Sequence, residues 1–189
     1  MVGLTMKPDD LATMWAADAL TQVSPKILKP AALRPEDESF LAHTGLPRQT
    51  WLPADDPFLL FPGEGAKPDD PAAGNMAMLD RYPGTPYRVV GYIGFRPFFG
   101  ICSYFGLKPA DGSVWMMDEN HPKGLLVNSG LLELSWSLFE YRKFREGTFP
   151  DERKQARTLR RQLANVDRRA FRDRNSYWPV MMADLMAMI

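Results

Sequence analysis

Four segments rich in β-forming residues follow one another between residues 87 and 127, with no helical pattern between them. Val, Ile, Tyr, Phe and Trp, the residue types enriched in strands, recur in these segments. Strands that cluster in this way, instead of alternating with helices, indicate an α+β fold with an antiparallel sheet and argue against a parallel doubly wound sheet. The four predicted strands cover residues 87–93, 101–105, 114–117 and 125–127.

The second and third of these strands are predicted to form a β-hairpin. The residues that join them include Pro109 and the pair Asp111-Gly112. Proline and Asp-Gly pairs between β-forming runs are typical of hairpin turns.

Helical patterns precede the strands. Pro8 and two acidic residues open an amphipathic pattern that predicts a helix over residues 8–23. A second short helix is expected over about residues 36–44, with three acidic residues at its start and Gly45 at its end.

Three further helices are predicted after the strands. Asn128-Ser129 is expected to cap a helix that runs from Leu131 to about residue 145. The apolar residues of this helix cover more than one face, so we expect it to be the central packing helix, laid on the sheet. Leu134, Leu138 and Tyr141 are predicted to be buried against the strands. The other two helices are expected near residues 151–166 and 176–188.

Residues 47–86 are rich in proline and glycine and show little apolar periodicity. They predict an irregular region in which Phe58-Leu59-Leu60-Phe61 is the one strand-like segment. The chain is therefore expected to form a single domain over residues 1–189. Its antiparallel sheet of four to six strands would pack with N-terminal and C-terminal helices, and residues 151–189 would add an Arg-rich helical extension.

Composition is that of a soluble globular protein, with 45% hydrophobic and 24% charged residues. Cys102 is the one cysteine, which excludes an internal disulfide and suits a reducing compartment. The N-terminus has no signal-peptide pattern, and no apolar run is long enough for a membrane span. We therefore predict a cytoplasmic protein without membrane association.

No motif predicts catalysis, a metal or a cofactor. His43, Cys102 and His121 lack the short spacings of metal-binding motifs, and the glycines of residues 91–106 lack the spacing of a phosphate loop. The acidic segment 118–121 follows a strand directly, where turn residues are expected. The chain is predicted to be non-enzymatic, with a hydrolase whose site carries no familiar motif as an alternative.

Charge is unevenly distributed along this neutral chain. Residues 1–122 hold ten Lys and Arg against fifteen Asp and Glu, whereas residues 123–189 hold thirteen against eight. Residues 151–175 have nine basic and four acidic residues, which raises the possibility of nucleic-acid binding. The sequence pI of about 6.7 favours a solvated helical face instead.

The acidic residues of the irregular region and of the turn after residue 117 are the candidate partner-binding residues. A solvated loop is the ordinary interpretation, and an acidic surface for a basic partner is the functional one. Five aromatic residues are candidate anchors, although core packing is the more ordinary interpretation for any one of them: Phe58, Phe61, Tyr82, Phe98 and Phe99. The acidic candidates are Asp55, Asp56, Asp69, Asp70, Asp118 and Glu119.

Four short segments, taken in order, resemble the SUKH superfamily of bacterial immunity proteins, in particular its fourth branch. The resemblance extends over about residues 36–145. Gly130 stands where a second serine often follows the Asn-Ser pair in that family. The segments are Phe40-Leu41-x-x-x-Gly45-Leu46-Pro47, Val89-Val90-Gly91-Tyr92-Ile93-Gly94, the hairpin from Ile101 to Trp115, and Leu126-Val127-Asn128-Ser129-Gly130-Leu131.

The resemblance implies an α+β fold without catalysis, and a function as the antitoxin of a cognate polymorphic toxin, often a nucleic-acid deaminase. The partner would be the toxin domain, and direct nucleic-acid binding is not expected. An acidic inhibitor surface agrees with this, because it would compete for the basic substrate groove of such a toxin. The alternative is a regulatory module of the same fold that binds an endogenous protein. A neighbouring toxin gene would favour the first hypothesis.

Overall fold

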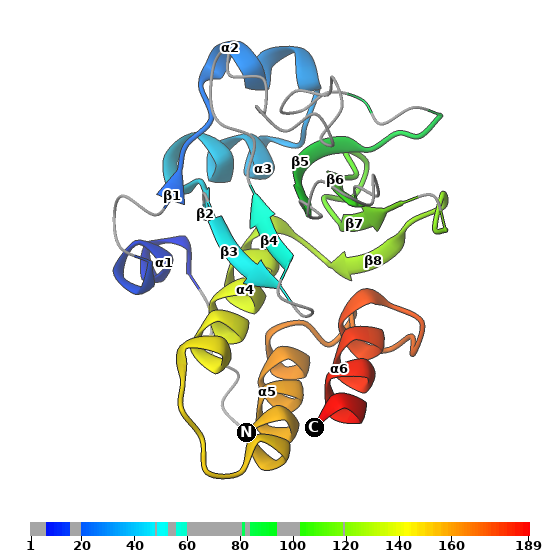
Figure 1. Ribbon diagram of the computed structural model, residues 1–189. Coiled ribbons are helices and arrows are strands. Elements are labelled where there is room, and N and C mark those ends of the chain that lie inside the picture. The colour runs from blue at the N-terminus through cyan, green and yellow to red at the C-terminus, as the bar shows by residue number, and fades with distance from the viewer. Residues whose placement is uncertain are drawn as a thin grey trace.

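The computed structural model describes residues 7–15, 20–47, 49–52, 56–59, 81, 84–93, 103–118 and 120–189. Short helices come first along the chain, then a sheet, then three longer helices (Figure 1). This order and the antiparallel pairing confirm the predicted α+β class.

The main sheet has six strands in the order β3-β4-β5-β6-β7-β8, so each strand pairs with its neighbours in sequence. Every pair is antiparallel, which makes the sheet an unbroken meander. The predicted hairpin is confirmed as β6 and β7. The strands are β3 (Gln49–Leu52), β4 (Asp56–Leu59), β5 (Arg88–Ile93), β6 (Ser103–Leu107), β7 (Val114–Met117) and β8 (Leu125–Asn128).

Two of these strands lie in the stretch that was predicted to be irregular. β3 was missed altogether, and β4 begins two residues before the strand-like segment that starts at Phe58. The prolines caused the error, because proline argues against a strand. Pro57 lies opposite Trp51 of β3, outside the part of β4 that pairs with β5, where a missing backbone N–H is tolerated.

A register shift in β8 buries two successive residues of this strand. β8 shifts against β7, because Val114 pairs with Asn128 and Trp115 pairs with Leu126. Val127 and Asn128 are consequently both buried, whereas successive residues of a regular strand lie on opposite faces. The shift thus brings a polar side chain into the core.

The N-terminal helix is shorter than predicted. α1 covers Pro8–Met14, and Trp15 already has extended backbone angles. β1 (Leu20–Thr21) then pairs with β2 (Leu46–Pro47), so pairing with another segment overrides the helical pattern of residues 8–23. α2 (Pro25–Leu28) and a 3-10 turn, η1 (Lys29–Ala31), follow in a stretch for which no helix was predicted.

The predicted helix of residues 36–44 is present in two parts. α3 (Pro35–Ser39) continues into η2 (Phe40–Thr44), which is a π-helical turn. Gly45 ends it with a φ of 81°. A side chain at this position would collide with the backbone of Thr21, so glycine is required both for the conformation and for the approach of β1.

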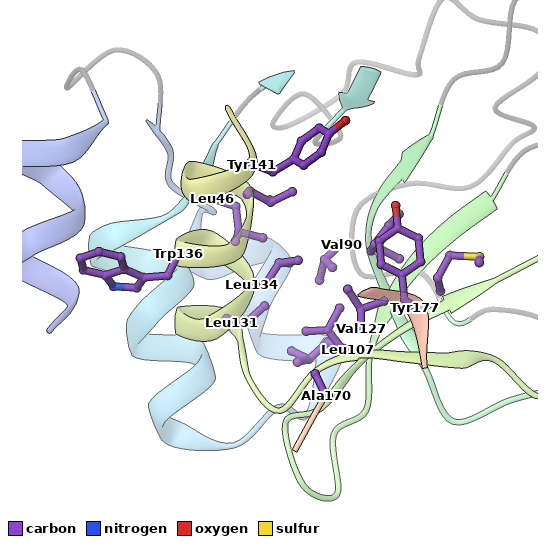
Figure 2. Packing of buried hydrophobic residues seen from close by; sticks show 14 of the residues in the cluster. Leu46, Val90, Leu107, Val127, Leu131, Leu134, Trp136, Tyr141, Ala170 and Tyr177 are labelled. Atoms are coloured by element: carbon purple, nitrogen blue, oxygen red, sulfur yellow. The ribbon is translucent and has the colours of Figure 1, made fainter. Parts of the chain in front are cut away.

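The three C-terminal helices occur close to the predicted positions, as α4 (Leu131–Glu146), α5 (Glu152–Val166) and α6 (Tyr177–Met188). Leu134, Leu138 and Tyr141 have no exposed surface, as predicted. Figure 2 shows Leu131 and Leu134 on the side of α4 that faces Val127, and Trp136 on the other side.

The opposite side of α4 packs on α1. The rings of Trp15 and Phe139 meet edge to face with centroids 5.7 Å apart, and the Arg142 guanidinium lies 5.3 Å from the Trp15 ring centroid. These contacts explain why the apolar residues of α4 cover more than one face: the helix is sandwiched between the sheet and α1. None of the helices in the described parts of the chain is long and apolar enough to cross a membrane.

The predicted N-cap of α4 is wrong. Gly130 occupies the N-cap position, and no side chain caps the helix. Asn128 and Ser129 lie before the cap, where the register shift of β8 turns the Asn128 side chain into the core instead of toward the helix N-terminus.

Candidate functional site

A cleft of about 460 Å³ lies between α3, η2 and the first turn of α4. Its lining combines charged groups with a few apolar side chains. Because α4 starts directly after β8, the strand fixes one wall of the cleft, and the short N-terminal helices form the other. The lining residues are Pro8, Arg34, Glu36, Asp37, Ser39, Phe40, His43, Thr44, Gly130, Leu131, Leu132 and Glu133.

Segments that are far apart in the sequence meet around this cleft, and they are among those on which the family resemblance rests. Phe40 comes from the first segment, and Gly130 and Leu131 come from the last. The hairpin contributes through its turn, because Gly112 packs so closely on the Arg34 guanidinium that a side chain at Gly112 would overlap it. Gly112 also has a φ of 69°, which favours glycine.

Arg34 is held at the edge of the cleft by carboxylates. Its Nε and Nη2 donate to the two carboxylate oxygens of Asp37 at 2.7 and 3.0 Å. Its Nη1 also lies 3.3 Å from a carboxylate oxygen of Glu36. The bidentate pair neutralises Asp37, which is buried.

Glu133 brings a further carboxylate to the cleft, in the first turn of α4. Burial raises the pKa of Glu133, and the charges of Asp167 and Asp37 act in the same direction, while its own backbone N–H and Arg34 oppose them. Three carboxyl groups and one guanidinium therefore line the cleft. The arrangement suits a cationic side chain from a partner, whose charge would favour the ionised form of Glu133.

The cleft does not hold a nucleophile activated by a base. His43 Nδ1 lies 2.9 Å from the backbone oxygen of Ser39, so this nitrogen is the donor, and the Ser39 hydroxyl is at 3.5 Å. Within the described ranges, no three His, Cys, Asp or Glu side chains are grouped as metal ligands would be.

Among the six acidic candidates, Asp118 is the one whose side chain the structure describes. Its carboxylate accepts hydrogen bonds from the backbone N–H of His121 at 2.6 Å and from His121 Nδ1 at 2.9 Å. Asp118 therefore closes the turn before β8 and is buried. The backbone of Asp56 begins β4. The other four, Asp55, Asp69, Asp70 and Glu119, lie outside the described residues.

Of the aromatic candidates, Phe58 is placed as a residue of β4. The others lie outside the described residues, and they are Phe61, Tyr82, Phe98 and Phe99. Cys102 also lies outside them, so two of the three residues considered for a metal site, His43 and His121, are described.

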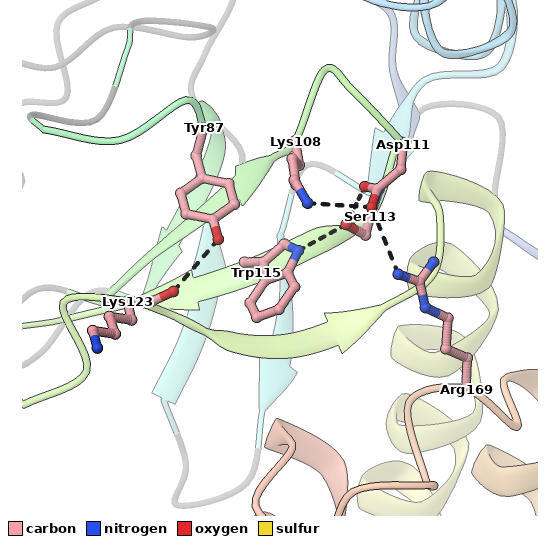
Figure 3. Close-up of polar contacts among 7 residues, drawn as sticks. All are labelled: Tyr87, Lys108, Asp111, Ser113, Trp115, Lys123 and Arg169. Atoms are coloured by element: carbon pink, nitrogen blue, oxygen red, sulfur yellow. Dashed lines mark hydrogen bonds and ion pairs between the residues drawn. The ribbon is translucent and has the colours of Figure 1, made fainter.

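A polar cluster covers the outer end of the β6–β7 hairpin (Figure 3). The Asp111 carboxylate accepts hydrogen bonds from the Ser113 hydroxyl and the Ser113 backbone N–H, and it pairs with Lys108 at 3.3 Å. Arg169 reaches the same carboxylate at 3.6 Å from the segment between α5 and α6. Burial opposes the ionisation of Asp111, but these hydrogen bonds and the Lys108 charge lower its pKa to about 2.

The cluster also orders the aromatic residues beside the turn. The Trp115 indole N–H donates to the Ser113 hydroxyl at 2.7 Å, and the Tyr87 and Trp115 rings lie 5.9 Å apart. The Asp111 carboxylate and the Ser113 hydroxyl are thus used to hold the hairpin, and we assign the cluster a structural role.

A buried polar network, which sequence reasoning missed, joins β8 to the C-terminal helices. The Asn128 amide donates to Ser137 at 3.1 Å and to Asp167 at 3.2 Å, and its oxygen accepts the Trp178 indole N–H at 3.1 Å. The Asp167 carboxylate also accepts the backbone N–H of Ser129 at 2.6 Å. The Asn-Ser pair therefore connects β8 to the C-terminal helices. Local sequence signals could not reveal this, because the partners of Asn128 lie 39 and 50 residues away.

A family model described as SUKH-4 immunity protein matches residues 6–184 of the chain. No curated protein and no solved structure matches it. The family match continues past residue 145 through α5 and into α6, beyond the range on which the resemblance was based. This further part of the chain includes the buried residues Asp167 and Trp178.

Proposed function

The chain belongs to the SUKH-4 immunity protein family, and from this we propose that it binds a cognate toxin protein in the cytoplasm and neutralises it by covering the toxin's active site. The observation that carries the proposal at the level of residues is the acidic cleft. Two of the segments that carried the family resemblance contribute to its lining, one through Phe40 and the other through Gly130 and Leu131.

We propose that the cleft receives a Lys or Arg side chain from the toxin. Glu133 is half-buried within the cleft, and Glu36 is exposed at its rim, where it shares Arg34 with the buried Asp37. A toxin that acts on nucleic acid, such as a deaminase, needs basic residues around its substrate groove because it contacts phosphates. Carboxylates presented to that groove would attract the toxin and exclude its substrate.

Acidic residues selected from the sequence are proposed as a second contact with the toxin, since carboxylates attract a basic substrate groove. They are Asp55, Asp56, Asp69 and Asp70, with Glu119; the carboxylate of Asp118 is already bonded to His121. Replacing Asp69 and Asp70 by Lys should slow association and leave dissociation nearly unchanged, because exposed charges mainly set the association rate. Kinetic binding measurements at two salt concentrations would check this.

The decisive experiment is co-expression with a toxin gene that neighbours the gene for this chain. Cells should survive only when the chain is present, and the two purified proteins should form a complex that blocks toxin activity. Glu36→Gln with Glu133→Gln should weaken that complex by about tenfold, as expected for two charge contacts of about 0.7 kcal/mol each. Glu38→Gln with Glu152→Gln removes the same charge outside the cleft and should change affinity less than about twofold.

Two results would contradict the proposal in different ways. Death of the co-expressing cells, with the chain folded and abundant, would refute toxin neutralisation. Survival together with equal losses in both double variants would refute the cleft as the contact and leave the immunity function intact. Stable capture of an endogenous protein in the absence of a toxin would favour the regulatory alternative.

A further inference from the structure

A second open pocket, of about 530 Å³, lies between α5 and α6. Figure 1 places these two helices at the lower end of the molecule, away from α3, which lines the acidic cleft. The pocket is basic and apolar, with no acidic residue in its lining. Its lining residues are Arg157, Arg160, Arg161, Ala164, Phe171 and Met186.

The three arginines are exposed, and within the described part of the chain none of them forms an ion pair or a side-chain hydrogen bond. The sequence of α5 excludes partners for them within the helix after its first residue, because no acidic residue occurs between Glu152 and Val166. By contrast, Arg142 and Lys143 of α4 each pair with a glutamate of the same helix.

The three arginines do not stabilise α5. Arg157 and Arg161 are four residues apart, and like charges at that spacing destabilise a helix by about 0.2–0.5 kcal/mol. The burial of Ala156, Leu159 and Leu163 on the other side anchors α5 without them. An opposite charge supplied from outside the chain would relieve the repulsion.

Apolar surface adjoins the arginines. Phe171 and Met186 are half-buried in the pocket wall. Beyond Met186, the exposed face of α6 carries Val180, Ala183 and Ala187 at helical spacing, with Asp184 among them. The exposed large hydrophobic residues in the described ranges all belong to this end of the chain: Val180, Met188 and Ile189.

We propose that this pocket is a docking site for an acidic, amphipathic peptide segment of a protein partner. Carboxylates of the segment would pair with Arg157, Arg160 and Arg161, and an apolar side chain would pack against Phe171 and Met186. Arginine and apolar residues together are typical of protein interfaces, and the guanidinium fork matches a carboxylate. The proposal is independent of toxin neutralisation, which uses the acidic cleft at the other end.

A protein segment fits these observations better than a nucleic acid. Nucleic-acid sites follow the phosphate backbone with many cations, and they present aromatic faces on which bases stack. Here the basic residues converge on one pocket, Phe171 is half-buried in its wall, and a largely apolar helix face, interrupted by Asp184, lies beside it.

The test uses the full chain and a fluorescent helical peptide of about 15 residues, with Glu along one stripe and Leu beside it. Two control peptides replace Glu by Gln or Leu by Ala, and a short DNA duplex is the fourth probe. Fluorescence anisotropy should show binding of the Glu/Leu peptide and weaker binding of both controls. Arg157→Gln with Arg161→Gln should reduce affinity at least about tenfold.

A matched control separates the pocket from net charge. Arg172→Gln with Arg174→Gln removes the same charge from exposed positions outside the pocket lining, and it should change affinity less than about twofold. Methyl NMR of Met186, assigned with Met186→Leu, should show a shift on addition of the peptide.

Three results would overturn the proposal. The first is the absence of peptide binding by the folded chain. The second is an equal loss of affinity in both arginine double variants, which would indicate unspecific attraction. The third is tighter binding of the duplex than of the peptide with the same dependence on Arg157 and Arg161, which would assign the pocket to nucleic acid.

Discussion

The indole N–H of Trp178 donates a hydrogen bond to the side-chain oxygen of Asn128 at 3.1 Å, which joins α6 to the last strand across 50 residues of sequence. Both side chains are fully buried. The same Asn128 amide donates to Ser137 and Asp167, so one side chain connects β8, α4, the segment after α5, and α6. A buried polar group is stabilising only while all its partners are present.

Asn128→Ala should lower the free energy of unfolding by about 1–3 kcal/mol, because it leaves the Trp178 N–H and the Ser137 hydroxyl without their partner. Urea denaturation followed by tryptophan fluorescence measures the change. Ser129→Ala is the control, since it keeps the backbone N–H that Asp167 accepts, and it should cost less than about 0.5 kcal/mol. Equal losses in the two variants would contradict the network.

Leu138→Ala should cost about 2–5 kcal/mol, because the side chain is completely buried where α4 meets the sheet and its removal leaves a cavity. Leu132→Ala, at a half-buried position of the same helix, should cost less. Denaturant midpoints at constant m-value give both numbers. A loss of stability below about half a kcal/mol for Leu138→Ala would contradict the burial of Leu138 between α4 and the sheet.

Asp111→Asn should destabilise the protein in a pH-dependent manner. The pKa of Asp111 is lowered to about 2 in the folded protein, so its ionised form contributes stability that is present above the ordinary value of 3.8 and is lost as the pH falls toward 2. The difference between Asp111→Asn and the unmodified chain should therefore be about 0.5–1.5 kcal/mol at pH 6 and should shrink below pH 4. Asp184→Asn, on the exposed face of α6, serves as the control.

Glu133→Gln should behave in the opposite way. Because burial raises the pKa of Glu133, its ionised form weakens the folded state at neutral pH, and this cost disappears as the pH falls below the ordinary value of 4.5. The substitution should raise the melting temperature at pH 7 and lose that advantage near pH 4. A stabilisation that is the same at both pH values would show that the carboxylate charge is not responsible.

The strands and helices of residues 87–189 were predictable because their signals are local. The Asp111-Gly112 turn, the β-forming runs beside it and the spacing of Leu134, Leu138 and Tyr141 each identify an element without knowledge of the rest of the chain. The strand β3 was not predictable, because it depends on pairing with β4 in a stretch whose prolines suggest a loop. The end of α1 depends in the same way on the pairing of β1 with β2.

The acidic cleft was also beyond sequence reasoning. Arg34, Glu36 and Glu133 are ordinary charged residues in their local context, and only the packing of α3 against α4 brings them together. The sequence did indicate that acidic residues in the first part of the chain deserve testing as the partner surface. It could not distinguish carboxylates with internal partners, such as Asp37 and Asp118, from those open to a partner protein.

The meander of β3 to β8 has a consequence for the order of folding. From β5 to β8 each strand pairs with the next strand through a short connection, although residues 60–87 separate β4 from β5, whereas the bonds from Asn128 to Asp167 and Trp178 close loops of 39 and 50 residues. Contacts of long sequence separation are expected to form after the transition state when local pairing can nucleate the fold. Asn128→Ala should therefore accelerate unfolding and leave the refolding rate nearly unchanged, a pattern that stopped-flow measurements can detect. The contacts of the C-terminal helices would then set the unfolding rate, and with it the lifetime of the native sheet.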